Sequence, residues 1–266
     1  MIIGKIAASK RGLLAAALTL GISFCGAAGA VAGEHGHAPH WGYEGEAGPS
    51  HWGDISKDNE ACKGKSQSPI NIEGTSEAPL ADISFSYKPS KLNIINNGHT
   101  IQVNYDKGSG IKVDGVDYEL VQFHFHDPSE HTVGGKSFAM ENHLVHKNAD
   151  GKLAVIGVLI EAGAENAAYK GVFANLPKKA NEKKELDVTV IADDLLPKDR
   201  AFYTYAGSLT TPPCSEIVTW IVLKTPIQMS KKQIAAFKKI FRNNNRPVQP
   251  LNGRTIKVKA AAAAAK

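Results

Sequence analysis

Beyond its first 32 residues the sequence has little net charge and no long hydrophobic run. Lys and Arg number 31 against 26 Asp and Glu, but three of the cations lie before residue 12. The remaining 28 Lys and Arg residues against 26 Asp and Glu residues leave a net charge of +2. This near-neutral charge gives no reason to expect a nucleic-acid partner. The apolar run 153–160 has only the length of a strand, so we expect no membrane span beyond residue 32.

Other features are missing as well. The chain has no internal repeat, no Pro/Gly-rich linker through its middle and no His-Glu-x-x-His motif. These absences argue against a repeat array, a two-domain chain and a zinc peptidase. With 42% hydrophobic residues, the sequence can bury one sizeable core.

The first 32 residues have the three parts of a secretory signal peptide. Three cations at positions 5–11 precede an apolar stretch over 13–24, and Ala30-Val31-Ala32 matches a cleavage site. We expect cleavage after Ala32 and a periplasmic or secreted catalytic domain of residues 33–266. The alternative is a retained membrane anchor.

Removal of this leader leaves two cysteines, Cys62 and Cys214. An even pair in an oxidising compartment predicts one disulfide. It would close a loop of about 150 residues, for which the chain-entropy model gives roughly 4–5 kcal/mol of stabilisation. Two free thiols are the alternative, because the sequence does not show that the two residues are close.

Both ends of the mature chain are biased in composition. Residues 33–52 are rich in Gly and Pro and carry four histidines, so they form either an irregular arm or an additional metal-binding tract. Trp41 and Trp52 indicate that the second half of this segment packs down. The Ala-rich end, 260–266, is expected to be a disordered tail.

Three histidines carry the strongest chemical signal. Residues 121–126 (VQFHFH) alternate apolar and polar, which is typical of a half-buried strand, so His124 and His126 share one face. His143 offers a third imidazole from a further strand. Three neutral imidazoles with an open fourth position describe a catalytic zinc site, whereas a structural site is closed and usually uses cysteine. Strand histidines that face water, or that are satisfied in the core, are the alternative.

The same strands supply support for these rings. Gln122 shares a face with His124, and Glu141 shares a face with His143. A metal-bound imidazole usually donates its other nitrogen to a carboxylate, an amide or a carbonyl. The pattern therefore predicts both the ligands and the groups that orient them.

Strand patterns outnumber helical ones. Alternation predicts strands over 83–87 and 101–105, and 218–223 is a further apolar strand. Asp114-Gly115 predicts a hairpin before the first two histidines, and Asp150-Gly151 predicts a turn after the third.

Helical spacing appears over 169–176 and after Ser230, which forms a capping box with Gln233. We predict a mainly β (α+β) fold. It is a single domain built on a large twisted, mostly antiparallel mixed sheet with a few short peripheral helices.

The sequence resembles the alpha-class carbonic anhydrases over nearly the whole mature chain. Each matching segment is weak alone, but together, in order and at appropriate spacing, they are highly specific. They are 41–43 (WGY), 67–72 (QSPINI), 96–99 (NNGH), 122–126 (QFHFH), 129–132 (SEHT), 141–146 (ENHLVH), 207–213 (GSLTTPP) and 218–220 (VTW).

The resemblance implies zinc at the base of a conical cleft and the reversible hydration of carbon dioxide to bicarbonate and a proton. A zinc-bound hydroxide would attack carbon dioxide. By resemblance, one Zn²⁺ per chain is held by His124, His126 and His143. The groups that orient these three ligands are Gln122, Glu141 and the backbone carbonyl near Asn244.

Further roles follow from the same resemblance. Thr210 would accept a hydrogen bond from the hydroxide and donate its own proton to Glu130, whose carboxylate only accepts. His99 would shuttle the proton out of the cleft. The residues expected to bind the substrate are Val145, Val155, Leu209, Thr210, Thr211, Val218 and Trp220, although plain core packing is the alternative for the apolar ones. The water network is expected to involve Tyr43, Asn97 and Gln102.

Secreted bacterial members also suggest a homodimer, a Cys62–Cys214 bridge that anchors the loop of Thr210, and cis peptides at Ser68-Pro69 and Pro212-Pro213. Asp127-Pro128 departs from the Trp-Gly that many members carry. Two other functions stay open. One is a catalytically silent binding relative, and the other is a zinc hydrolase of esters.

Overall fold

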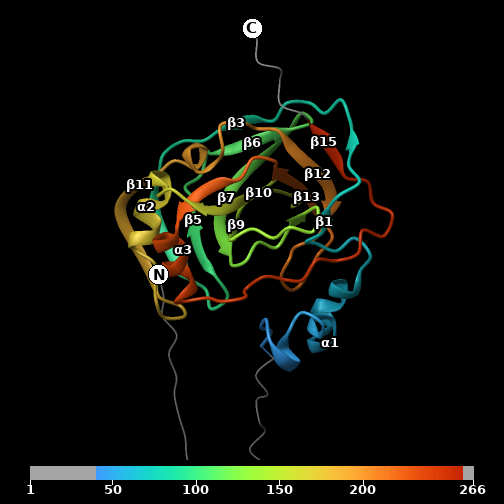
Figure 1. Ribbon diagram of the computed structural model, residues 1–266, viewed down its shortest axis with the longest axis horizontal. Coiled ribbons are helices and arrows are strands. Elements are labelled where there is room, and N and C mark those ends of the chain that lie inside the picture. The colour runs from blue at the N-terminus through green and yellow to red at the C-terminus, as the bar shows by residue number, and fades with distance from the viewer. Residues whose placement is uncertain (1–39, 260–266) are drawn as a thin grey trace, which may run out of the picture. The chain divides into compact units, whose positions relative to one another are not determined.

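The computed structural model describes residues 40–259. The predicted signal peptide, the first histidines of the arm and the Ala-rich tail lie outside the described residues. Within them, strands dominate and helices are short, as predicted (Figure 1). None of the described helices is long and apolar enough to cross a membrane.

The strands differ in length. They are β1 (Asn71–Ile72), β2 (Ser76–Glu77), β3 (Ser84–Ser86), β4 (Ser90–Asn96), β5 (Ile101–Asn104), β6 (Gly110–Val113), β7 (Val116–His126), β8 (Thr132–Val133), β9 (Met140–Lys147), β10 (Leu153–Gly163), β11 (Lys183–Val190), β12 (Phe202–Gly207), β13 (Val218–Leu223), β14 (Ile227–Ser230) and β15 (Lys257–Lys259). The helices are η1 (Gly45–Ala47), α1 (Trp52–Ile55), η2 (Lys57–Lys63), α2 (Ala167–Ala174), η3 (Ala192–Leu195) and α3 (Lys231–Lys238).

One mixed sheet forms the body of the fold. Its strands follow the order β11-β4-β5-β7-β9-β10-β13-β12-β15-β2. Pairing from β11 to β10 is antiparallel, but β13 and β14 both run parallel to β10. The predicted mostly antiparallel mixed sheet is therefore confirmed.

Local signals in the sequence place the turns and caps where we expected them. Asp114 and Gly115 adopt positive φ angles of 48° and 81° and join β6 to β7 in a two-residue hairpin, which is why a flexible pair is needed there. At α3, the Ser230 hydroxyl accepts from the backbone N–H of Gln233, and the Gln233 side chain accepts from the Ser230 N–H. This is the predicted capping box.

The two faces of the sheet have different tasks. On one face Phe125 packs against Tyr169, Phe173 and Phe237, with ring centroids 5.3–6.0 Å apart, and so fixes α2 and α3 on the sheet. Figure 1 shows these two helices next to one another beside β11. The other face carries the histidines and a second apolar cluster around Trp220. Side chains alternate along β7, so packing of Phe125 into the core turns His124 and His126 toward the opposite face of the sheet.

The segment that follows His40 packs down as predicted. Trp52 is fully buried, and its indole N–H donates to the carbonyls of Gly42 and Ala47 at 2.8 Å and 3.0 Å. Trp41 meets Trp52 edge to face at 5.2 Å.

Candidate metal centre

The three predicted histidines meet in space. His124 and His143 are register partners on β7 and β9, and His126 lies two residues further along β7. One ring nitrogen from each lies within 4.8 Å of the others. Rigid neighbouring strands therefore produce the predicted facial trio.

The remaining ring nitrogens have the supports that the sequence indicated. His124 Nδ1 lies 2.9 Å from Gln122 Oε1, and His126 Nδ1 lies 2.7 Å from the Asn244 carbonyl. His143 Nε2 lies 3.0 Å from Glu141 Oε1, although its angle departs from hydrogen-bond geometry.

These supports leave Nε2 of His124, Nε2 of His126 and Nδ1 of His143 for a ligand. His126 Nε2 is buried without any partner, which is the condition of a metal-binding nitrogen. Burial lowers the pKa of all three rings, that of His126 to about 4, and so keeps them neutral. Neutral imidazole is the form that coordinates a cation, so the trio fits a single Zn²⁺ with one open position.

Glu130 is buried beside the trio. Its Oε1 accepts from the Arg246 backbone N–H at 2.8 Å. Burial raises the pKa of this carboxyl to about 7, against the opposing effects of His143, the Arg246 N–H and the neighbouring Thr210 hydroxyl. A bound divalent cation would favour the carboxylate form. Thr210 and Glu130 thus lie together, as the resemblance implied.

A cavity of about 120 Å³ opens onto His124 and His126. It is lined by Trp41, Tyr43, Asn97, His99, Thr100, Gln102, Gln122, His124, His126 and Thr211. All three residues predicted for the water network are among them. A larger hollow of about 360 Å³ over β3 and β6 is lined by none of the three histidines, so size alone does not mark the site.

Strand register brings together the apolar residues that we expect to bind the substrate. Across the sheet, Val145, Val155 and Trp220 are successive partners on β9, β10 and β13. Leu209 and Val218 belong to the same apolar cluster. The structure thus brings the predicted apolar lining together.

A row of amides runs beside His124, because Gln102 on β5 is the register partner of His124 on β7. Asn97 donates to Gln102 at 3.3 Å, Gln102 donates to Asn104 at 2.7 Å, and Asn104 donates to Asn93 at 3.4 Å. At the inner end, Asn97 Oδ1 accepts from the backbone N–H groups of His99 and Thr100. The amide row therefore holds the turn that carries His99.

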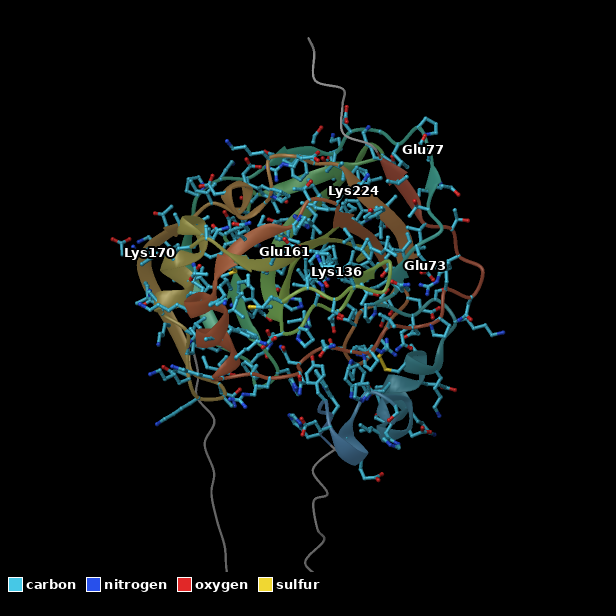
Figure 2. The ribbon with its side chains drawn as sticks, viewed as in Figure 1. Glu73, Glu77, Lys136, Glu161, Lys170 and Lys224 are labelled. Carbon is cyan, nitrogen blue, oxygen red and sulfur yellow. A yellow bond between two sulfur atoms is a disulfide. The ribbon has the colours of Figure 1, made fainter. Side chains whose placement is uncertain are left out.

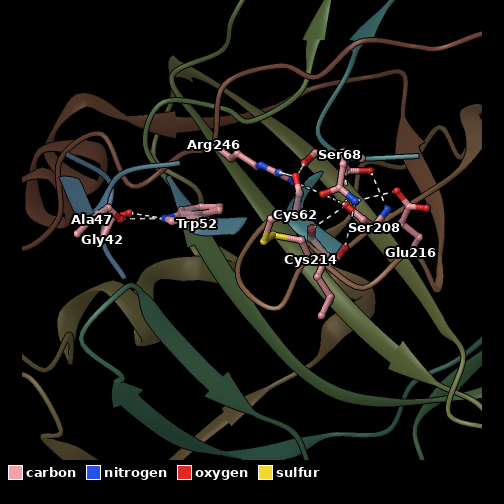
Figure 3. The surroundings of a disulfide bond; sticks show 11 residues. Gly42, Ala47, Trp52, Cys62, Ser68, Ser208, Cys214, Glu216 and Arg246 are labelled. Atoms are coloured by element: carbon pink, nitrogen blue, oxygen red, sulfur yellow. Dashed lines mark hydrogen bonds between the residues drawn. A yellow bond between two sulfur atoms is a disulfide. The ribbon is translucent and has the colours of Figure 1, made fainter. Parts of the chain in front are cut away.

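The predicted disulfide is present. Cys62 and Cys214, 152 residues apart, join η2 to the loop that follows Thr210 (Figure 3). Buried Arg246 reinforces the junction by donating to the carbonyls of Cys62 and Ser68 at 3.2 Å and 2.9 Å. Both predicted cis peptides occur, and Asp127-Pro128 is a third that we did not predict.

At Asp127-Pro128, where many family members carry Trp-Gly, the Asp127 side chain has partners in the fold. Its buried carboxylate lies 3.1 Å from Lys238 Nζ on α3, and its backbone N–H donates to Asn244 Oδ1. Burial raises the pKa of Asp127, while Lys238 and Arg242 act in the opposite direction. An ion pair thus occupies the position directly after His126.

Sequence reasoning missed a second cluster. His131, Glu141 and His143 also place one polar atom each within 4.8 Å. His131 Nδ1 lies 2.7 Å from Glu141 Oε1, and its Nε2 lies 2.6 Å from the Tyr205 hydroxyl. No local pattern points to Tyr205, because the partners are 74 residues apart.

Comparison with known proteins gives the family. A sequence model described as eukaryotic-type carbonic anhydrase matches residues 47–260. The chain belongs to the alpha-carbonic anhydrase family. The carbonic anhydrase of Klebsiella pneumoniae is 47% identical over 223 residues, which are 82% of this chain and 91% of that protein. That of Pectobacterium carotovorum is 42% identical over 92% of this chain and 99% of its own length.

Solved structures agree. A hyperthermostable carbonic anhydrase from a hydrothermal vent chimney is 50% identical, with a TM-score of 0.81 over 83% of this chain and all of that one. The alpha-carbonic anhydrase of Thermovibrio ammonificans, in complex with sulfanilamide, is 46% identical, with a TM-score of 0.80 over 82% of this chain and 98% of that one. The predicted family, fold and carbon dioxide hydration are thereby confirmed, and none of these proteins favours the silent alternative.

Proposed function

We propose that this carbonic anhydrase is a secreted or periplasmic zinc enzyme whose cleft residues hold the roles that the family resemblance implied. The observation that carries this proposal is the His124, His126 and His143 trio. Each ring has its outer nitrogen beside an acceptor, and the buried inner nitrogen of His126 has no partner. Bound Zn²⁺ lowers the pKa of a coordinated water to about 7, an effect for which carbonic anhydrase itself is the standard example.

Thr210 and Glu130 orient the nucleophile. Glu130 as a carboxylate only accepts, so the Thr210 hydroxyl donates to it. The Thr210 oxygen is then left to accept a hydrogen bond from the nucleophile, which directs a lone pair toward the substrate. The backbone N–H of Thr210 would receive an oxygen of carbon dioxide.

The apolar wall receives carbon dioxide and the polar wall removes the proton. Carbon dioxide has no net dipole, so the surface of Val145, Val155 and Trp220 suits it without a hydrogen-bond cost. On the other side, His99 accepts the proton through water held by Tyr43 and the amides. The Tyr43 hydroxyl is buried without a partner and so is available to such a water.

Stopped-flow carbon dioxide hydration by the chain of residues 33–266 tests the proposal. We expect one zinc per chain and fast hydration that a zinc chelator abolishes and added zinc restores. His126→Ala should lose both zinc and activity, whereas His51→Ala, an exposed histidine outside the cleft, should keep both. A folded, zinc-loaded protein without hydration would contradict the proposal.

The leader and the assembly state are part of the proposal. Secreted protein should begin at Gly33 when its N-terminus is sequenced. Analytical ultracentrifugation should show a homodimer. A protein that retains residues 1–32 in the membrane fraction would support the anchor instead.

A further inference from the structure

The amide row extends from the cleft to the β11 end of the sheet. Gln102 lines the cavity beside His124, and Asn104 lies two residues further along β5, on the same face of the strand. Asn104 is the register partner of Asn93 on β4, and Asn93 is the register partner of Glu185 on β11. Strand register therefore lines up polar side chains across three neighbouring strands, and the last of them, Glu185, is exposed.

Each amide in this row donates outward to the next side chain. Nδ2 of Asn97 donates to Gln102 at 3.3 Å, and Nε2 of Gln102 donates to Asn104 at 2.7 Å. Nδ2 of Asn104 donates to Asn93 at 3.4 Å, and Nδ2 of Asn93 donates to Glu185 at 3.5 Å. The shortest contact in the row is thus the one between Gln102 and Asn104.

The two ends of the row impose the same direction on it. A side-chain amide can turn over and exchange its donor with its acceptor, unless its partners can play only one role. At the inner end the backbone N–H groups of His99 and Thr100 only donate, so Asn97 turns its oxygen toward them. At the outer end the carboxylate of Glu185 only accepts, so Asn93 turns its nitrogen toward it. The amides between these ends are thereby held in one orientation.

Gln102 is the side chain through which this orientation reaches the cleft. Its amide gives one hydrogen to Asn104 and takes one from Asn97, which leaves one donor site and one acceptor site for water. A reversed Gln102 amide would set its oxygen against the oxygen of Asn104. Asn104 therefore decides which way Gln102 presents its donor and its acceptor.

We propose that Asn104, held by Asn93, is a positioning residue for the exit of the proton, because it fixes the Gln102 amide and the water between the metal centre and His99. The inference rests on the proposed function of His99 and extends it to two side chains that are not among those lining the cavity. Proton transfer depends on alignment, and a misplacement of about 1 Å can cost on the order of 100-fold in rate. The attack on carbon dioxide does not use the row, so only the proton step should respond.

The test uses two substitutions at one position. Asn104→Leu has a similar volume but removes the acceptor of the Gln102 amide. Asn104→Asp keeps that acceptor, because a carboxylate accepts. Asn148→Leu is the matched control: Asn148 is also half-buried, but it lies in the turn between β9 and β10 and accepts the Lys152 N–H at 2.8 Å.

Stopped-flow carbon dioxide hydration separates the two steps. The ratio kcat/KM covers the steps up to release of bicarbonate, whereas kcat in weak buffer also includes the exit of the proton. We expect Asn104→Leu to lower kcat in weak buffer on the order of 10-fold while kcat/KM stays the same. Added imidazole buffer should restore kcat, because it accepts the proton itself. Asn104→Asp and Asn148→Leu should stay near the wild type.

A double variant links the effect to His99. If Asn104 acts only through the path to this ring, Asn104→Leu should cause no further loss of kcat in a His99→Ala background. Additive losses would show that Asn104 acts on some other step, and would overturn the inference.

Three further results overturn the inference alone. They are a wild-type kcat of Asn104→Leu in weak buffer, a parallel fall of kcat and kcat/KM that imidazole does not restore, and an Asn104→Asp variant as impaired as Asn104→Leu. If His99→Ala by itself leaves kcat in weak buffer unchanged, the proposed role of His99 fails and the inference fails with it. The His99→Ala variant thus distinguishes the two failures.

Discussion

His99 stacks face to face on Trp41, with ring centroids 3.6 Å apart and planes 7° from parallel. The ring of His40 is also stacked on His99 at 4.8 Å. Burial in this stack, and then the charge of His40, lower the pKa of His99 to about 4. A proton acceptor works best when its pKa is near the operating pH, so the stacked position is unfavourable for the proposed shuttle.

Trp41→Ala should therefore free the His99 ring. We expect the pKa of His99 to rise from about 4 toward the ordinary value of about 6.5. NMR titration of the His99 ring protons measures this change directly. Because the acceptor then matches neutral pH better, turnover in weak buffer should rise while kcat/KM stays the same. An unchanged His99 pKa would show that Trp41 is not what buries the ring.

Glu130→Gln should reverse the direction of the proposed hydrogen bond between residue 130 and Thr210. Gln can still accept the Arg246 N–H through its oxygen, but its amide would donate to Thr210, whose proton would then point toward the nucleophile. Loss of one such oriented contact costs on the order of 10²–10³-fold, and we expect this loss in kcat/KM with zinc content unchanged. Glu161→Gln is the control, since Glu161 is paired with Lys136 at 3.0 Å on the surface (Figure 2). Equal activity of the two variants would refute the assigned role of Glu130.

His146 should make the fold sensitive to acid. It is fully buried between the Tyr87 hydroxyl, at 2.9 Å, and the Ala154 carbonyl, and burial lowers its pKa to about 4. The unfolded chain binds the proton near pH 6.5, so this stability is complete above that pH and is lost as pH falls toward 4. The full loss is on the order of 3 kcal/mol, of which about 2 kcal/mol falls between pH 8 and pH 5.

Urea unfolding of the wild type and of His146→Gln at these two pH values checks the prediction. The variant should be less stable at pH 8, because it loses the two contacts, but its stability should change less on acidification. The same pH dependence in both proteins would assign the acid sensitivity to other groups.

The disulfide should matter for both stability and the Thr210 loop. Cys62→Ser with Cys214→Ser removes a cross-link between residues 152 positions apart, and the chain-entropy model gives a loss of up to about 4–5 kcal/mol. The free energy of unfolding in urea measures this loss. We also expect a lower kcat/KM, because the junction would then be held only by non-covalent contacts such as the hydrogen bonds of Arg246 to the Cys62 carbonyl and of Gln67 to the Cys214 carbonyl. A double variant as stable as the wild type would contradict the prediction.

The sequence by itself determined the parts that depend on local periodicity. Alternation over 121–126 put His124 and His126 on one face, a Gly-containing turn set the hairpin before them, and Ser230 with Gln233 set the start of α3. The roles of Thr210 and His99 came from resemblance, since a loop threonine and a turn histidine carry no local signal.

Only the tertiary structure decided which distant groups meet. The Asn244 carbonyl reaches His126 across 118 residues, and Tyr205 reaches His131 across 74. Register alone places Gly157 opposite His143, where a Cβ would strike Glu141. Alternation along a strand fixes the face of the sheet on which a side chain lies. Strand order and register fix which residues are its neighbours. Order and register depend on the packing of the whole sheet, so they cannot be read from one segment of sequence.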